Sequence, residues 1–415
     1  MTVELPDAAT LKAMGETILI AGQRAADPPM MPVVRLHEPT FGKDEIAAAV
    51  AVLQSTRVTQ GAKVREFEHR FWPAGHAVAC NSGSSANLLA IAGLVSTGML
   101  EPGDEVIVSA LSWSTTVWPL VQHGLVPVFV DCDPLTLNID PSMVERAIGP
   151  KTRAIMPVHV YGNPCNMAVM GSIVDRAGIG LIEDCCEALG AEFQEEPVGS
   201  FGHAATFSFY FSHHITTLEG GIVVTQNDAL DDTLRIQRSH GWVRDVANPQ
   251  KYTEAHPDID PNFLFVDLGY NLRMTELQAA IGLVQLPKLA PIVEHRRKMH
   301  RLYRTKLAGA PHLRFQLETP GGDSSCFGFT IVLDGFPRAD LTRALNAGGV
   351  ETRPIICGNL AAQPGMQKHK HRVVGELRNA TNVMRNGFSV GCHQDVTEAD
   401  VDHVVSIIQA VLCGR

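Results

Sequence analysis

The stretch EVIVSALSWSTTVWPLVQHGLVPVFVD, residues 105–131, carries the pattern that decides the fold. A short apolar run over 105–111 is followed by a helical segment over 114–123 and by a second apolar run over 126–131. A strand, a helix and a strand in this order are typical of a βαβ unit, whose two strands lie parallel in one sheet. The stretch therefore predicts a parallel sheet that is covered by helices.

The same alternation of apolar runs and helical segments continues through residues 76–226. It predicts an α/β domain with a mainly parallel sheet. The additional strands that we expect lie at 154–160, 180–183, 205–209 and 222–225, and the additional helices at 85–96, 141–148 and 165–177.

With 415 residues, the chain is long enough for a large domain and a smaller attached one. We expect an N-terminal arm over 1–35, a large domain over 36–290 and a small C-terminal α/β domain over 291–415. Outside the alternating region we expect an amphipathic helix in the arm at 8–24, helices at 43–54, 275–289, 295–307 and 398–412, and two strands in the C-terminal domain.

The composition argues against a nucleic-acid-binding, membrane-spanning or secreted protein. A net charge of −10 argues against nucleic acid or an anionic membrane as the main partner. No apolar run approaches the ~20 residues of a membrane helix, and the N-terminus lacks the basic start and apolar core of a secretory signal. We therefore expect a cytoplasmic protein. Its nine cysteines, without a Cys-x-x-Cys pair, are expected to be free thiols, and no metal site is expected.

Small and hydroxyl-bearing residues open the helix expected at 85–96. The segment Asn81–Asn87 contains Ser82, Gly83, Ser84 and Ser85. Backbone N–H groups and the helix dipole favour an anion at such a helix start, so Gly83 and Ser84 are candidates for a phosphate site. The alternative is an ordinary helix cap, for which serine and asparagine are equally suited.

Two further residues follow the ends of expected strands, where ligands of α/β sheets bind. Asp184 closes the apolar run 180–183, and a carboxylate there could keep a pyridine nitrogen protonated. Trp113 follows the run 105–111 and could stack on a flat ring. The alternatives are a helix cap for Asp184 and core packing for Trp113.

The order of these elements, followed by the segment Ser208–His214, resembles the DegT/DnrJ/EryC1/StrS family of sugar aminotransferases, which have the type I fold of pyridoxal 5'-phosphate (PLP) enzymes. The segments 59–61, 158–162 and 269–276 extend the resemblance over roughly residues 35–410. It implies PLP as cofactor and a homodimer with shared active sites. The residues that it places at the cofactor are Gly83, Ser84 and Ser208 at the phosphate, Asp184 at the pyridine nitrogen, Trp113 on the ring, Glu187 where many members have glutamine, and Asn271 from the partner subunit.

His213 stands where the family has the lysine that binds PLP covalently. No lysine occurs between Lys151 and Lys251. Imidazole can move protons as a general acid or base, but it cannot replace the amine that holds the cofactor covalently. The resemblance therefore implies the chemistry of the family's sugar 3-dehydratases, which use pyridoxamine 5'-phosphate (PMP), with His213 as the base.

One branch of these dehydratases carries an iron–sulfur cluster, which needs about four thiolates. The segment Glu219–Met274 contains no cysteine, so we expect the cluster-free branch. By the same resemblance His240 is a second catalytic histidine. Arg353 is a candidate clamp for a substrate carboxylate, with a structural ion pair as the alternative. We expect removal of the C3 hydroxyl from a nucleotide-linked 4-keto-6-deoxy sugar, GDP-4-keto-6-deoxy-D-mannose in the first place, with L-glutamate as amino donor and release of ammonia.

Three other interpretations stay open. The sugar could carry CDP or dTDP instead of GDP, because nothing in the sequence identifies the base. The protein could be an aminotransferase that uses His213 in an unusual way. It could also be a non-catalytic PLP-binding protein, although the presence of His213 and His240 argues against this interpretation.

Overall fold

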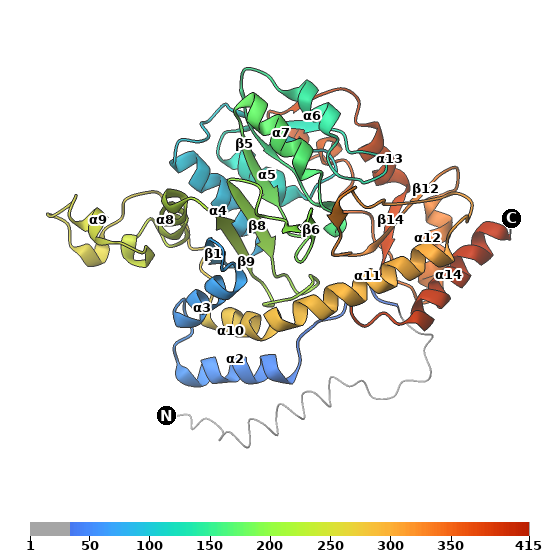
Figure 1. Cartoon of the computed structure of the whole chain (residues 1–415), viewed down its shortest axis with the longest axis horizontal. Helices are drawn as coiled ribbons and strands as arrows, with labels where there is room; N and C mark the ends of the chain where they lie inside the picture. The colour runs from blue at the N-terminus through green and yellow to red at the C-terminus, as the bar shows by residue number, and fades with distance from the viewer. Residues whose placement is uncertain (1–33, 415) are drawn as a thin grey trace.

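The computed structural model describes residues 34–414, so the helix expected at 8–24 lies outside the described residues. An eight-stranded sheet runs through the centre of the molecule in the order β1-β9-β8-β5-β4-β2-β3-β13 (Figure 1). Only β9 is antiparallel to both of its neighbours, and the other pairs are parallel. The α/β class and the mainly parallel sheet are thus confirmed. The strands are β1 (His76–Cys80), β2 (Glu105–Ser109), β3 (Val126–Val130), β4 (Thr152–Met156), β5 (Gly180–Asp184), β8 (Ala204–Ser208), β9 (Gly221–Thr225) and β13 (Arg372–Val373).

Helices cover both faces of this sheet, which explains why its strands are nearly continuous apolar runs. In β2, Val106 and Val108 pack toward one face, and Ile107 packs toward the other. The first face is covered by α4 (Gly83–Ser96), α5 (Ser114–Gln122) and α8 (Asp228–Arg238). The second face is covered by α3 (Ala62–Phe71), α6 (Pro141–Ala147), α7 (Met167–Ala177) and α10 (Glu276–Gln285), with α2 (Lys43–Ser55) packed on α10.

The strand expected over 154–160 is shorter than the sequence suggests. β4 ends at Met156, because Pro157 has no N–H group for the ladder. The chain then turns through the short 3-10 helix Val160–Gly162, in which Tyr161 has a left-handed φ of 55°. This turn brings the following residues back to the end of the sheet.

A smaller three-stranded antiparallel sheet, β10 (Leu313–Phe315), β12 (Phe329–Leu333) and β14 (Gly387–Val390), lies in the C-terminal part. It has one strand more than expected. It shares a separate core with α11 (Leu289–Lys306), α12 (Arg338–Ala347) and α14 (Glu398–Cys413). The domain boundary near residue 290 stays a prediction. The remaining elements are α9 (Gln250–Thr253), α13 (Arg378–Asn386) and the small sheet of β6 (Glu192–Phe193), β7 (Glu196–Pro197) and β11 (Gly322–Asp323).

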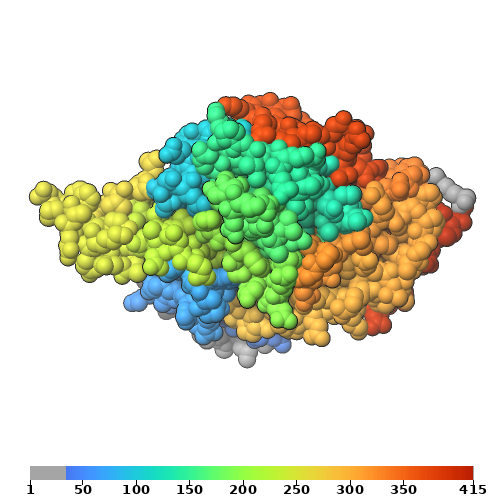
Figure 2. Space-filling view, turned by 45° about the horizontal axis from the view of Figure 1, so that its top comes forward, coloured from blue at the N-terminus to red at the C-terminus, as the bar shows by residue number. Residues whose placement is uncertain are grey.

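Residues 240–270 form an arm that projects from the body of the molecule, yellow in Figures 1 and 2. The arm has a small core of its own around Val243, Val246 and Leu264. It exposes large apolar side chains, including Phe263 at 63% and Leu268 at 86%. Among the described residues, no helix is long and apolar enough to cross a membrane.

Candidate active site

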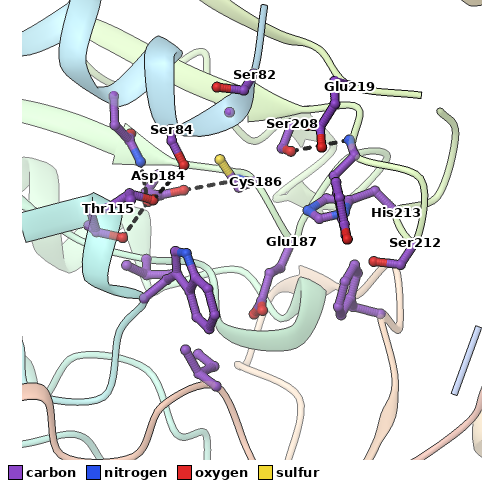
Figure 3. Close-up of a pocket in the computed structure, with 18 of the residues that line it drawn as sticks. Ser82, Ser84, Thr115, Asp184, Cys186, Glu187, Ser208, Ser212, His213 and Glu219 are labelled. Atoms are coloured by element: carbon purple, nitrogen blue, oxygen red, sulfur yellow. Dashed lines mark hydrogen bonds between the residues drawn. The ribbon is translucent and has the colours of Figure 1, made fainter. Parts of the chain in front are cut away.

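A pocket opens at the carboxyl ends of the parallel strands, where the loops after β2, β5 and β8 meet the C-terminal part of the chain (Figure 3). Its volume of about 490 Å³ is in the usual range for small-molecule sites. The residues expected from the sequence that line it are Gly83, Ser84, Trp113, Asp184, Glu187, Ser208, His213 and Arg353.

The start of α4 forms one end of the pocket. Ser82 caps this helix by accepting a hydrogen bond from the N–H of Ser85, while Ser84 donates to Thr115 Oγ1 at 3.0 Å. A Cβ atom on Gly83 would lie 2.5 Å from the Cβ of Ser208, so only glycine allows the two segments to meet here. Free backbone N–H groups and hydroxyl groups therefore converge at one point, as an anion site requires.

The carboxylate of Asp184 is held in a fixed orientation on the pocket wall. One oxygen accepts hydrogen bonds from Asn87 Nδ2 at 3.0 Å and from Thr116 Oγ1 at 2.7 Å. The other accepts from the backbone N–H of Cys186 at 3.1 Å. Asp184 is only 3% exposed, so an incoming cation or protonated ring nitrogen would meet a charge that water screens little.

Trp113 is 50% exposed and lies on the pocket wall rather than in the core. The core-packing alternative therefore does not describe this side chain. Its broad apolar face beside the Asp184 carboxylate suits a flat, charged heteroaromatic ring.

His213 lies on the loop between β8 and β9. Its backbone N–H donates to the carbonyl of Tyr210 at 2.9 Å, and its ring is edge-on to the rings of Phe327 and Tyr210, with centroids 5.1 and 5.9 Å away. Burial, assisted by the charges of Arg296 and Arg353, lowers the pKa of His213 to about 3. The imidazole is thus neutral at physiological pH. Its Nδ1 atom has no hydrogen-bond partner among the described residues.

The neighbouring His214 is not among the residues that line the pocket. It is fully buried, and its Nε2 atom is hydrogen-bonded to the carbonyl of Ser325 at 3.0 Å. This bond ties the loop to the C-terminal part of the chain. No lysine is among the residues that line the pocket in the described part of the chain.

Glu187 and Arg353 face the pocket from different elements. Glu187 accepts a hydrogen bond from the backbone N–H of Tyr161 at 2.9 Å, and burial raises the pKa of its carboxyl to about 7. Arg353 is paired with β14 through its backbone, where it forms a bridge with Ser389. Its guanidinium forms no hydrogen bond or close ion pair with the described residues, although its charge partly offsets the rise in the pKa of the Glu187 carboxyl.

His240 and Asn271 do not lie at this pocket. Both are exposed, and they are neighbours at the base of the projecting arm, where Ser239 and Asn271 form a bridge. The backbone N–H of His240 donates to the carbonyl of Tyr270 at 2.7 Å, and His240 has a left-handed φ of 67°. Within a single chain, the structure therefore separates these two residues from the other expected ones.

The pocket also contains residues that sequence reasoning missed, namely Thr115, Thr116, Cys186, Tyr210, Ser212, Glu219 and Phe327. The pair Thr115–Thr116 could have been found, because it follows Trp113 directly. Phe327 comes from a distant part of the chain that has no recognisable signal. Left-handed φ angles at Tyr161, Leu218, Cys326 and Ile356 cluster around the pocket, and such strain is typical of functional sites.

Comparison with known proteins agrees with this geometry. The family model of the DegT/DnrJ/EryC1/StrS aminotransferase family matches residues 39–409. GDP-4-keto-6-deoxy-D-mannose 3-dehydratase of Escherichia coli O55:H7 is 38% identical over 385 residues, which cover 90% of this chain and 99% of that protein. The dTDP-4-dehydro-2,6-dideoxy-D-glucose 3-dehydratase of Saccharopolyspora spinosa is 37% identical, with coverages of 90% and 86%.

A solved structure of GDP-4-keto-6-deoxymannose-3-dehydratase with a trapped PLP–glutamate geminal diamine superposes with a TM-score of 0.84 at 36% identity, and the match covers 90% of this chain and 100% of that one. The type I fold expected from the sequence is confirmed. The chain belongs to the DegT/DnrJ/EryC1/StrS aminotransferase family.

Proposed function

We propose that the protein is a cluster-free, PLP/PMP-dependent 3-dehydratase of a nucleotide-linked 4-keto-6-deoxy sugar, with GDP-4-keto-6-deoxy-D-mannose as substrate and L-glutamate as amino donor. The observation that carries this proposal is His213, a neutral imidazole on the pocket wall where the family has its lysine. Relatives that are 3-dehydratases, among them those at 38% and 37% identity reported above, support the same reaction.

The pocket fits the cofactor. The helix start at Gly83 and Ser84, together with Ser208, would hold the phosphate, Asp184 would pair with the ring nitrogen and Trp113 would stack on the ring. When bound, PMP supplies an amino group for the C4 ketone of the sugar and an electron sink that allows the C3 substituent to leave. Asp184 sustains that sink, because its carboxylate is held by Asn87 and Thr116 and favours a protonated nitrogen.

His213 would act as the base that removes the proton at the reacting carbon. Burial lowers its pKa and keeps the ring unprotonated, so that a ring nitrogen can accept the proton. The rings of Phe327 and Tyr210 limit the orientations that the imidazole can adopt. Glu187, with a pKa near 7, is the neighbouring group that can exchange a proton at neutral pH.

Arg353 would bind a carboxylate of L-glutamate. An arginine without a hydrogen-bonded partner among the described residues, half-buried at the pocket wall, offers two parallel N–H donors to such a group. The likeness to a structure with a trapped PLP–glutamate adduct supports glutamate as the donor.

His240 and Asn271 would complete the pocket of a partner subunit in a homodimer. Both are exposed, and they adjoin the projecting arm, whose exposed Phe263, Phe265 and Leu268 provide an apolar surface for contact. In such a dimer, the two residues that lie away from the pocket of their own chain would contribute to the pocket of the partner.

The experiment that tests the function is incubation of the purified protein with PLP, L-glutamate and GDP-4-keto-6-deoxy-D-mannose. We expect ammonia, 2-oxoglutarate and a sugar product that has lost the C3 oxygen, measured by mass spectrometry. An amino sugar without ammonia would overturn the dehydratase and restore the aminotransferase. If neither 2-oxoglutarate nor a new sugar forms, the non-catalytic interpretation gains support.

A second candidate is a 3-dehydratase of a dTDP-linked 4-keto sugar. It is favoured by the 37% identity to the dTDP-4-dehydro-2,6-dideoxy-D-glucose 3-dehydratase. The same incubation with the dTDP-linked sugar distinguishes the two, because only the true substrate should release ammonia. Formation of 2-oxoglutarate without ammonia from the GDP-sugar would point to this alternative.

A further inference from the structure

Arg296 is a buried cation without a nearby countercharge. The residue lies on α11, is 2% exposed, and donates one N–H to the carbonyl of Phe327 at 2.9 Å and, more weakly, to that of Cys392 at 3.4 Å. Its Nε has no acceptor among the described residues. The carboxylate that acts on it electrostatically, Asp395, is exposed to solvent. Although burial lowers the pKa of Arg296 to about 10, the guanidinium stays charged at neutral pH.

Such an arrangement is costly, because a buried charge that is not paired loses its hydration without a Coulombic return. A hydrophobic side chain of similar volume would fill the same space at less cost. The cost therefore points to a role for the charge, and the surroundings of Arg296 indicate where that role lies.

The contacts of Arg296 lead to the loop between β8 and β9 that carries His213 and His214. Its acceptor Phe327 has its ring edge-on to His213, with centroids 5.1 Å apart, and also contacts the ring of His214 at 5.7 Å. Two residues away, the carbonyl of Ser325 is bonded to His214. One guanidinium thus supports the segment against which both histidines pack, and its positive charge acts on both rings.

We propose that Arg296 is a positioning residue for His213: through the carbonyl of Phe327 it anchors the segment against which the imidazole packs, and it adds a positive charge to the surroundings of that ring. This inference deepens the proposed function and rests on it for the role of His213 as a base. Arg296 is the first of the charged groups that lower the pKa of His213, after burial itself. The other charged or titratable groups around that ring are Arg353, His37, His214, Tyr210 and, on the pocket wall, Asp184, Cys186, Glu187 and Glu219.

The adjacent Arg297 offers a matched control. It too lies on α11 and binds the same segment through a main-chain carbonyl, donating from Nε to Ser324 at 2.7 Å. It is less buried and is paired with Asp323 at 2.9 Å. Replacing it removes a comparable anchor without removing an uncompensated charge.

The test is a pH titration of the His213 imidazole in the full-length protein without substrate. The titration is monitored by NMR of labelled histidine, and the His213 signal is assigned by its absence in His213→Gln. Arg296→Gln keeps a donor for Phe327 but removes the charge, and the midpoint of His213 should rise by about one pH unit or more. In Arg296→Lys, which keeps the charge, and in Arg297→Gln the midpoint should stay low. The pH dependence of kcat should change in the same way: the acid limb of the profile should shift to higher pH in Arg296→Gln and stay unchanged in the other two variants.

An unchanged midpoint in folded Arg296→Gln would overturn the proposal. A His213 midpoint near the ordinary histidine value in Arg296→Lys would also overturn it. The lysine variant therefore tests the proposal even if the glutamine variant does not fold. Because these titrations need no sugar substrate, their failure is separate from a failure of the dehydratase assignment.

Discussion

The backbone of Gly83, at the start of α4, lies directly against Ser208, at the end of β8. A Cβ atom on Gly83 would stand 2.5 Å from the Cβ and 2.7 Å from the Oγ of Ser208. These segments are 125 positions apart in the sequence, and their contact brings the helix start and the serine hydroxyl together at the end of the pocket where we propose that the phosphate binds.

Gly83→Ala should therefore weaken cofactor binding. Because backbone and a short side chain must shift, we expect a loss of about 1–3 kcal/mol in stability and at least a tenfold higher Kd for PLP, measured by absorbance titration. Gly171→Ala in α7 is the control, because a Cβ there meets nothing within 4 Å. It should leave PLP binding unchanged and stability equal or higher by up to about 1 kcal/mol. Equal Kd values for the two variants would place the phosphate elsewhere.

The hydrogen bond from Thr116 to Asp184 should also contribute to cofactor affinity. Thr116→Val removes a 2.7 Å bond to a buried carboxylate, and bonds to charged groups are worth about 1.5–3 kcal/mol. We expect PLP to bind about tenfold or more weakly. Thr305→Val, an exposed helical threonine away from the pocket, is the control. A Thr116→Val variant with normal affinity would show that Asn87 and the backbone N–H of Cys186 are enough to orient the carboxylate.

His213→Lys should weaken dehydration and allow PLP to bind covalently. General acid–base catalysis typically contributes 10²–10⁴-fold, so we expect dehydration to fall by about 10³-fold, although lysine can also move protons. In addition the amine should hold PLP covalently. Borohydride reduction followed by mass spectrometry would then detect cofactor bound to the protein in His213→Lys, but neither in the wild type nor in the surface control His256→Lys. Covalent cofactor in the wild type would contradict the role assigned to His213.

The positions of the strands and several pocket residues could be read from the sequence for a physical reason. Strands buried on both faces are continuous apolar runs, and Trp113, Asp184 and Ser208 follow or close such runs, so they share one edge of the sheet. Phe327 could not be found in this way. It reaches the pocket because the C-terminal part of the chain packs there, and no local sequence pattern predicts that contact.

Glu187 should make stability depend on pH. Burial raises the pKa of its carboxyl from 4.5 to about 7, so between these values the unfolded chain has lost the proton while the folded protein keeps it. The free energy of unfolding should then fall as pH rises through this window, by up to about 3 kcal/mol. Glu187→Gln can still accept from Tyr161 and should be more stable than the wild type at pH 8, though not below pH 4.5, in urea unfolding of the cofactor-free protein. The exposed Glu254→Gln should show no such difference, and a pH-independent gain in Glu187→Gln would rule out ionisation as its cause.

If His240 acts in the pocket of the partner subunit, two inactive variants should complement each other. In mixed dimers of His213→Gln and His240→Gln, one site carries both substitutions and the other carries neither. Random mixing makes half of the dimers mixed, so about a quarter of the wild-type activity should return in the unfractionated mixture, and about half of it in the isolated mixed dimer. The measurement is ammonia release after co-expression of the two variants with different affinity tags and isolation of the doubly tagged dimer, in which half of the sites are intact. If His240 instead served the pocket of its own chain, every site would lack one histidine and no activity would return. Since His240 is exposed beside Asn271 and does not line its own chain's pocket, we expect complementation, and an Asn271→Ala variant should complement His213→Gln in the same way.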